Sequence, residues 1–184
     1  LSLYDYISFS DQDDIWNENK ITMGINNLKQ DNSEGYSSNV LAYWNKDKLK
    51  KITKSQKQRS HDHYFESAGP GCTYILSNKL AISLKEFIKE NEKNITDFPH
   101  HDWMIYAYSR EHGFKWTIDK NYTMYYRQHD ENELGVNIGI KAFLKRLKQV
   151  FSGVAIRKHI KLSRLLNFNN YFLIDNEIIH RKHS

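Results

Sequence analysis

The chain has 184 residues and a formal net charge of +5, and 39% of its residues are hydrophobic. This length corresponds to one domain, or one domain with an appendage, and the apolar content excludes an intrinsically disordered protein. The single cysteine, Cys72, excludes an intramolecular disulfide and fits a reducing compartment. Because the sequence has no signal peptide and no long apolar run, it predicts no membrane-spanning segment.

Positive charge is concentrated towards the C-terminal end. Residues 134–174 contain no Asp or Glu, and they carry eight basic residues: Lys141, Lys145, Arg146, Lys148, Arg157, Lys158, Lys161 and Arg164. Since these eight exceed the net charge of +5, the rest of the chain is net negative. The basic character therefore belongs to the tail.

Three carboxylates directly follow a short apolar run near the N-terminal end: Asp11, Asp13 and Asp14. Within the run, side chains alternate in a way that predicts a strand over 6–9 with one buried face. Apolar residues at helical spacing predict a helix over 15–30, and Asp13 or Asp14 is a candidate cap for it. The acids are thus expected where a strand leads into a helix, which is the edge at which open α/β sheets bind ligands.

This acidic segment has the chemistry of a divalent-metal site. Like charges this close repel one another, and protonation or a bound cation must relieve the repulsion. Asp11 and Asp13 can point the same way in an extended turn and offer hard oxygen ligands to Mg²⁺ or Mn²⁺. Mg²⁺ takes only one or two protein carboxylates and completes its shell with phosphates and water. The pattern indicates a metal carried on a nucleotide diphosphate, and a solvated turn with a helix cap is the alternative.

Residues 5–16, DYISFSDQDDIW, followed by the run from Asn19 to Ile21, resemble the metal-binding segment of family 2 glycosyltransferases. The likeness is greatest to the bacterial rhamnosyltransferase-like branch. The resemblance implies a GT-A fold, an α/β sheet that binds a sugar nucleotide. It also implies that Asp13 is the direct metal ligand, that Asp11 and Gln12 bind the donor, and that Asp14 caps the helix.

The middle of the chain predicts a strand over 40–45 and a mobile surface loop over 46–59, which is rich in Lys and Gln. His61, Asp62 and His63 look like a metal cluster. Three adjacent residues rarely chelate one ion without a distant ligand, so an exposed loop is expected instead.

A Gly-rich turn over 69–74 leads into the next predicted strand. Gly71 allows a ligand to approach the backbone closely, and the resemblance implies that it lies near the donor sugar and the acceptor. A plain turn before a strand is the alternative. Ser77 then caps a predicted helix that carries apolar residues at helical spacing: Leu80, Leu84, Phe87 and Ile88.

A second cluster, DFPHHDW, covers residues 97–103. Helical spacing from Trp103 to Arg110 predicts a helix that starts near Asp97 and Pro99. Asp102 then lies close to the helix N-terminus, where the macrodipole favours the ionised form that a general base needs. A capping or salt-bridged acid is the alternative. The resemblance implies that Asp102 deprotonates the acceptor hydroxyl and that Trp103 lines the acceptor or sugar pocket.

Alternating residues over 114–119 predict a further strand, and the segment 126–129, YRQH, follows it. This segment resembles the family's Tyr-Arg-x-His. The resemblance implies that His129 completes the metal shell, which slightly favours Mn²⁺ over Mg²⁺. Arg127 can pair with the donor diphosphate through its planar fork. An aromatic edge strand with a surface histidine is the alternative.

The tail predicts two basic amphipathic helices, one over 140–151 and one over 154–166. The alternatives are a helical hairpin packed on the core and a peripheral contact with anionic lipid.

Taken together, the sequence and the resemblance lead us to expect an α/β, partial GT-A fold. Residues 1–137 would be the C-terminal portion of the catalytic domain, and 138–184 a basic helical extension. Because the chain opens at Leu1 almost directly on a strand, the family's first nucleotide-binding βαβ portion is expected to be missing.

The expected function is inverting, metal-dependent transfer of rhamnose or a similar sugar in bacterial cell-surface polysaccharide synthesis. The donor would be a dTDP- or UDP-sugar, and the acceptor a saccharide, with lipid-linked saccharides included. The expected location is the cytoplasm, at the inner face of the membrane. Two alternatives stay open: a non-catalytic metal-binding fragment, and a nucleic-acid-binding module built on the basic tail, which has no recognisable nucleic-acid motif.

Overall fold

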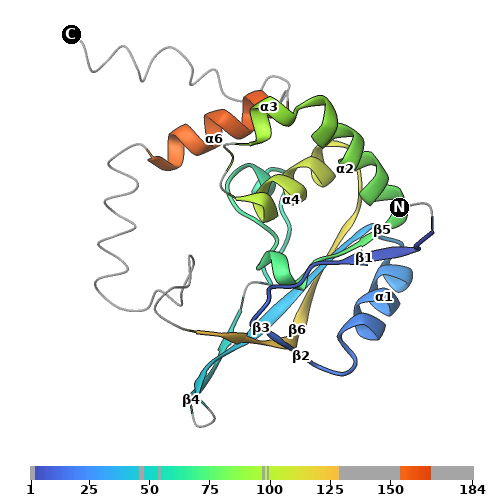
Figure 1. Cartoon of the computed structure of the whole chain (residues 1–184), viewed down its shortest axis with the longest axis vertical. Helices are drawn as coiled ribbons and strands as arrows, with labels where there is room; N and C mark the ends of the chain where they lie inside the picture. Colours follow the sequence, from blue (N-terminus) through green and yellow to red (C-terminus); the bar gives the residue numbers. More distant parts are fainter. Residues whose placement is uncertain are drawn as a thin grey trace.

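The computed structural model describes residues 3–45, 48–53, 55–96, 98, 100–128 and 154–166. Its centre is a six-stranded sheet in the order β1-β5-β3-β6-β2, with β4 paired to β3 (Figure 1). The strands are β1 (Tyr6–Ser8), β2 (Ile15–Trp16), β3 (Gly35–Asn45), β4 (Lys48–Ile52), β5 (Ile75–Ser77) and β6 (Trp116–Arg127). The helices are α1 (Lys20–Asp31), α2 (Asn78–Glu90), α3 (Glu92–Ile95), α4 (His101–Glu111) and α6 (Val154–Leu165), with short 3-10 turns η1 (Asp62–Tyr64) and η2 (Gly71–Thr73).

The sheet is mixed because β3 and β6 run parallel while the other pairs run antiparallel. These two long strands pair from Gly35 opposite Trp116 to Tyr43 opposite Arg127, with register shifts near Asn39. Parallel neighbours need a long crossover, and here the segment between them contains β4, β5, α2 and α4.

Apolar residues cover both faces of the sheet. On one face, Leu28 of α1 packs with Tyr36 and Ile75. On the other, α2 and α4 pack over a larger cluster that includes Tyr74 and Trp116, as their positions in Figure 1 show.

Several expected elements are confirmed. The strand over 6–9 is β1, and the strand over 40–45 is the second half of β3, which already begins at Gly35. Ser77 caps α2, because its hydroxyl accepts a hydrogen bond from the Leu80 N–H at 3.3 Å. The helix with Asp102 in its first turn is α4, while Asp97 and Pro99 lie outside the described residues.

Three expectations are wrong. The helix expected over 15–30 begins only at Lys20, because Ile15 and Trp16 pair with β6 as β2. Neither Asp13 nor Asp14 caps it, since the N-cap is Asn19 without a side-chain cap bond. The expected loop over 46–59 contains strand β4, which finds a full-length partner in β3.

The described part of the tail is α6, which packs on the core. Its residues Leu162 and Leu165, with Leu166 after it, are buried, and His159 Nδ1 lies 2.9 Å from the Tyr64 carbonyl oxygen. Within the described ranges, no helix has both the length and the apolar content that a bilayer crossing requires. The stripe over 140–151 and the expected boundary at 137/138 lie outside those ranges.

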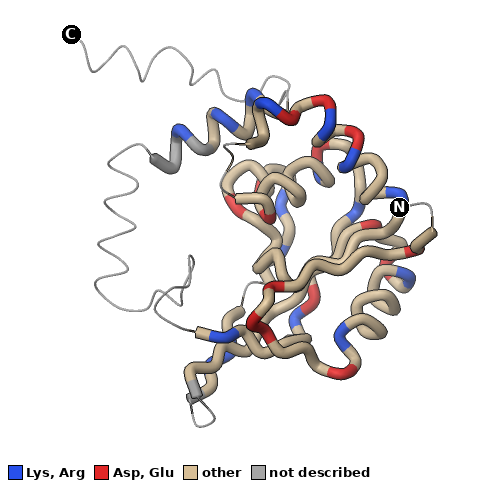
Figure 2. Tube along the Cα trace, viewed as in Figure 1, with Lys and Arg blue, Asp and Glu red and all other residues tan. Residues whose placement is uncertain are grey.

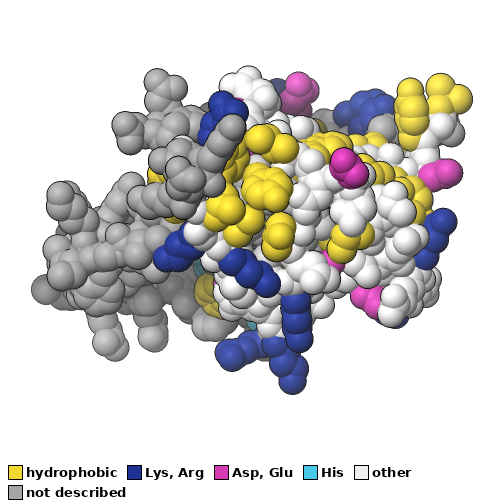
Figure 3. All heavy atoms as spheres, turned by 90° about the horizontal axis from the view of Figure 1, so that it is seen from below, with side chains coloured by type: hydrophobic (Ala, Val, Ile, Leu, Met, Phe, Trp, Pro, Cys, Tyr) yellow, Lys and Arg dark blue, Asp and Glu magenta, His cyan; other side chains and the backbone are white. Residues whose placement is uncertain are grey.

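Charge is unevenly spread over the fold (Figure 2). Acidic positions mark the segment between β1 and β2, whereas Lys and Arg recur along α6. Seen from below (Figure 3), hydrophobic side chains are exposed beside Lys and Arg side chains. The large apolar residues exposed on β2, β4 and β6 are Ile15, Trp16, Leu49 and Tyr122.

Candidate functional site

The acidic elbow, Asp11 to Asp14, joins strands at opposite ends of the sheet order. β1 pairs with β5 on one side, and β2 pairs with β6 on the other. The chain is fixed before the elbow by the Phe9 N–H, which donates to the Tyr74 carbonyl at 3.0 Å. It is fixed after the elbow by the Asn17 N–H, which donates to the Thr123 carbonyl at 3.0 Å. The elbow is therefore held at both ends by the sheet.

Two carboxylates of the elbow converge, and they are those of Asp11 and Asp14. Their oxygens and the Cys72 sulfur lie within 4.8 Å of one another. Asp14 Oδ1 accepts a hydrogen bond from the Arg127 backbone N–H at 3.1 Å, so Asp14 ties the elbow to β6 and does not cap α1. Asp13 is half-buried beside this group, and Gln12 is exposed.

The other oxygen of Asp14, Oδ2, is buried, and no described nitrogen or hydroxyl group donates to it; the Cys72 thiol, a weak donor, interacts with this carboxylate. Burial raises the pKa of Asp14, and the negative charges of Asp11 and Asp13 raise it further. Burial likewise raises the pKa of the Cys72 thiol, which stays protonated at neutral pH. A buried carboxylate oxygen with at most a weak thiol donor beside it, facing a second carboxylate, fits a hard divalent cation. We conclude that the residues present suit such an ion, with Asp11 and Asp14 as oxygen ligands.

The turn η2 packs between this elbow and the first turn of α4. A Cβ atom placed on Gly71 would lie 3.0 Å from His101 Nε2 and 3.1 Å from Asp102 Cβ. The next residue, Cys72, contacts the elbow. Gly71 is thus needed for close packing of α4 on the turn, and Asp102 and the elbow lie on two sides of one short segment.

Asp102 is held in place by its own helix end. Its Oδ1 accepts a hydrogen bond from the Trp103 N–H at 2.8 Å, and its carbonyl oxygen accepts one from the Tyr74 hydroxyl at 3.3 Å. The side chain is half-buried. A carboxylate fixed at one oxygen and partly open to solvent can accept a proton at the other.

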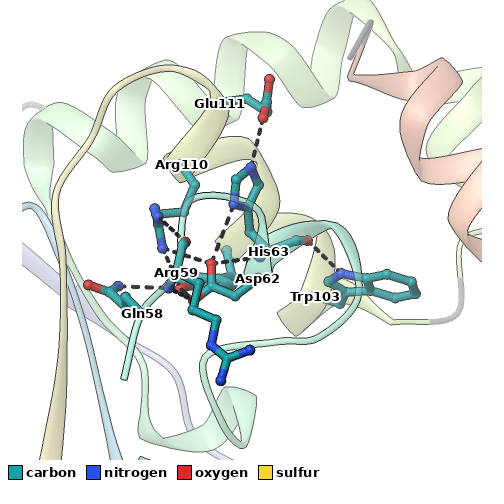
Figure 4. A network of polar contacts seen from close by, with 8 residues as sticks. Gln58, Arg59, Asp62, His63, Trp103, Arg110 and Glu111 are labelled. Atoms are coloured by element: carbon teal, nitrogen blue, oxygen red, sulfur yellow. Dashed lines mark hydrogen bonds and ion pairs between the residues drawn. The ribbon is translucent and has the colours of Figure 1, made fainter. Parts of the chain in front are cut away.

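The neighbouring Trp103 is fixed by a network that the sequence did not predict (Figure 4). Its indole N–H donates to the His63 carbonyl at 2.8 Å. His63 is 3% exposed, and its Nε2 lies 2.7 Å from Glu111 Oε1. The expectation of an exposed loop over 61–63 therefore holds for His61, which is exposed, and is wrong for His63, because η1 folds onto α4.

Asp62 is the centre of the same network. Its carboxylate accepts hydrogen bonds from Arg110 Nη1 at 3.0 Å and from the Tyr106 hydroxyl at 3.1 Å. Arg110 also donates to the Arg59 carbonyl at 3.0 Å. These contacts clamp the segment before η1 to α4, and with it the carbonyl that holds Trp103.

Arg127 lies at the end of β6 next to the elbow. Its backbone binds Asp14, and its exposed guanidinium donates through Nε to the Tyr43 hydroxyl at 2.9 Å. The guanidinium is thus exposed and close enough to Asp13 and Asp14 to interact with their charges. His129, the second expected metal ligand, lies outside the described residues.

Lys20 is a residue that the motif reasoning missed. It is 0% exposed, and its Nζ donates to the Cys72 carbonyl at 2.9 Å and to the Phe9 carbonyl at 3.2 Å. Burial lowers the pKa of Lys20 to about 8, while the charges of Asp14 and Asp11 act in the opposite direction. The only signal for it in the sequence was its place in the resembling segment after the elbow.

Comparison with known proteins bears on the expected relationship to glycosyltransferases. The chain is similar to the dTDP-rhamnosyl transferase RfbG of Shigella flexneri. The two are 46% identical over 147 residues, which make up 80% of this chain and 51% of that protein. The chain thus spans about half the length of this relative. No protein-family model matches the chain. The similarity supports the expected relationship to rhamnosyltransferase-like glycosyltransferases.

Proposed function

We propose that this chain is part of a glycosyltransferase that moves a sugar, rhamnose by similarity, from a dTDP- or UDP-sugar to a saccharide acceptor. The observation that carries the proposal is the packing at η2, where Cys72 lies beside the acidic elbow and the preceding residue, Gly71, packs against Asp102. The similarity to a dTDP-rhamnosyl transferase adds the donor class. The mixed α/β sheet is compatible with a Rossmann-like glycosyltransferase fold, and we take GT-A as its specific form.

Asp11 and Asp14 would hold a divalent ion, Mn²⁺ or Mg²⁺, on the donor diphosphate. Asp13 and His129, the ligands that the resemblance implies, remain candidates to complete the shell. When bound, such an ion neutralises charge that develops on the departing diphosphate. Arg127, with its guanidinium exposed beside the elbow, can bind a phosphate oxygen through its planar fork.

Asp102 would act as the general base. It removes the proton from the acceptor hydroxyl while that oxygen attacks the anomeric carbon from the face opposite the diphosphate. The bond to the diphosphate oxygen breaks, and the configuration inverts. The sugar develops oxocarbenium character on the way, as in glycoside hydrolysis. Trp103, oriented by the His63 carbonyl, would form a wall of the acceptor pocket.

The proposal includes both free and lipid-linked saccharide acceptors, with synthesis of cell-surface polysaccharide as the setting. For a lipid-linked acceptor, the basic tail would contact the anionic membrane surface.

The test is Mn²⁺-dependent turnover of a panel of nucleotide sugars, with Asp102→Asn, Asp11→Asn and Asp14→Asn variants. We expect Asp102→Asn to lower the transfer rate about 10² to 10⁴-fold, the range for loss of a general base, with little change in the Mn²⁺ requirement. The Asp11→Asn variant should raise the Mn²⁺ requirement instead, and Asp14→Asn, which alters the buried carboxylate, should abolish metal-dependent transfer. Glu18→Gln, an exposed acid close in sequence, is the matched control. Wild-type transfer that persists after complete chelation of metal would contradict the proposal.

A further inference from the structure

A buried ammonium group lies where the two halves of the candidate site meet. Lys20 begins α1, and its side chain is 0% exposed. Its Nζ lies 2.9 Å from the Cys72 carbonyl oxygen, 3.2 Å from the Phe9 carbonyl oxygen and 3.3 Å from the Ser8 hydroxyl. An ammonium has three protons to donate, so these acceptors use its full capacity.

The partners of Lys20 come from separate segments of the site. Ser8 ends β1 and Phe9 follows it towards the elbow, whereas Cys72 belongs to η2. The ammonium also lies 3.5 Å from the centre of the Trp16 ring, which follows the elbow. One side chain therefore touches the chain before the elbow, the chain after it, and the turn that packs against Asp102.

The free energy of folding alone does not favour burying the Lys20 ammonium among these partners. Burying an ammonium is costly, and replacing a buried charge by an apolar residue of similar size is often neutral or stabilising. The carboxylates of Asp14 and Asp11 lower that cost by their charge. A buried lysine here gives the elbow a fixed cation and a fixed distance to η2.

We propose that Lys20 is a positioning residue that holds the acidic elbow and η2 in one geometry, and so sets the metal-binding carboxylates relative to Asp102. The inference rests on the proposed function for its catalytic consequence. Its structural part concerns only how the elbow binds a divalent ion.

Electrostatics and positioning predict opposite results for Lys20→Met, which has a side chain of similar length without charge. If electrostatics alone decided the result, removing the positive charge of Lys20 would remove its repulsion of the bound cation and so tighten Mn²⁺ binding. Releasing the elbow from η2 would weaken that binding, because the two carboxylates would no longer be held together. The sign of the change in Mn²⁺ affinity therefore separates the two roles.

The experiment measures Mn²⁺ binding without nucleotide sugar, from the free-Mn²⁺ signal in electron paramagnetic resonance, in the full protein. Lys20→Met is compared with Lys20→Gln, which keeps two hydrogen-bond donors but no charge. Lys29→Met, an exposed lysine on the same helix, is the matched control. We expect Lys20→Met to weaken Mn²⁺ binding about 10 to 100-fold, the range for lost outer-shell partners of metal ligands. Lys20→Gln should lie between Lys20→Met and wild type.

Kinetics supply the second readout. We expect kcat for transfer to fall more than the donor KM rises, and the melting temperature to change by only a few degrees. Unchanged or tighter Mn²⁺ binding in Lys20→Met would overturn the inference. If Lys20→Met does not fold, the same result in Lys20→Gln would overturn it. If wild type binds Mn²⁺ but transfers no sugar, the proposed function fails while the binding comparison still decides the role of Lys20.

Discussion

The assignment of the metal ligands leads to a prediction about Asp13 and Asp14. The resemblance implies Asp13 as the ligand, whereas the structure brings the carboxylate of Asp14 next to that of Asp11. We expect Asp14→Asn to abolish Mn²⁺ binding and Asp13→Asn to retain most of it. The two substitutions are isosteric and one residue apart, so each is the control for the other.

The structure also predicts that Asp14→Asn stabilises the metal-free protein. Asp14 Oδ2 is buried with only the weak thiol donor of Cys72 beside it, and it faces a second carboxylate. An unsatisfied buried polar group costs about 1 to 3 kcal/mol. Because Asp14 is only half-buried, we take the low end, about 1 kcal/mol, which corresponds to about 2 to 4 °C in melting temperature for a chain of this length.

The gain in stability from Asp14→Asn should decrease as the pH is lowered. Burial raises the pKa of Asp14 in the folded protein above the unfolded value of 3.8. An acid with a raised folded pKa stabilises the fold below its unfolded pKa, and that contribution is lost as pH rises through the folded pKa. The advantage of Asp14→Asn over wild type should therefore be greatest above the raised folded pKa and shrink as the pH falls through it towards 3.8.

Thermal unfolding with and without Mn²⁺ measures both effects. An ion present at 100 times its dissociation constant stabilises the folded state by about 2.7 kcal/mol. We expect that shift in wild type and in Asp13→Asn, and none in Asp14→Asn. The opposite outcome, a shift retained in Asp14→Asn and lost in Asp13→Asn, would refute the assignment and restore Asp13 as the ligand.

Three further predictions concern other parts of the site. The pKa of Lys20 is lowered from 10.5 to about 8 in the folded protein, so the unfolded chain binds more protons between these two pH values. The free energy of unfolding of wild type relative to Lys20→Met, measured in urea, should therefore rise between pH 8 and 10.5, by about 3 kcal/mol at most. Gly71→Ala places a methyl group 3.1 Å from Asp102 Cβ. Because a displaced catalytic group slows a reaction strongly, we expect the rate of sugar transfer to fall about tenfold or more, while Mn²⁺ binding persists. Arg110→Met removes the cation 3.0 Å from the half-buried Asp62 carboxylate. It should cost about 2 kcal/mol in chemical unfolding, the range for losing a hydrogen bond to a charged group; a cost near zero would mean that the network does not hold η1.

Local features of the fold were predictable because their causes lie within a few residues. The alternation over 6–9 gives β1, and the Ser77 hydroxyl binds the N–H only three residues ahead. The same is true of Asp102, whose place in the first turn of α4 follows from the helical spacing of the residues behind it.

Features that depend on distant partners were not predictable in this way. Ile15 and Trp16 form a strand instead of a helical turn because Tyr125 and Met124 provide its hydrogen-bonding partners. His63 is buried because Glu111, on α4, lies against its ring. In both cases the deciding contact is with a residue far along the chain.

By itself, the sequence determined that three carboxylates follow a strand, that an aspartate begins a later helix, and that these segments resemble those of a glycosyltransferase. Only the tertiary structure decided which carboxylates converge. Side-chain directions in an irregular turn are set by what the turn packs against, here the Arg127 N–H, which binds Asp14, and the Cys72 sulfur beside it. Burial of Lys20 beneath the elbow has the same origin, because its acceptors come together only when β1 and η2 meet.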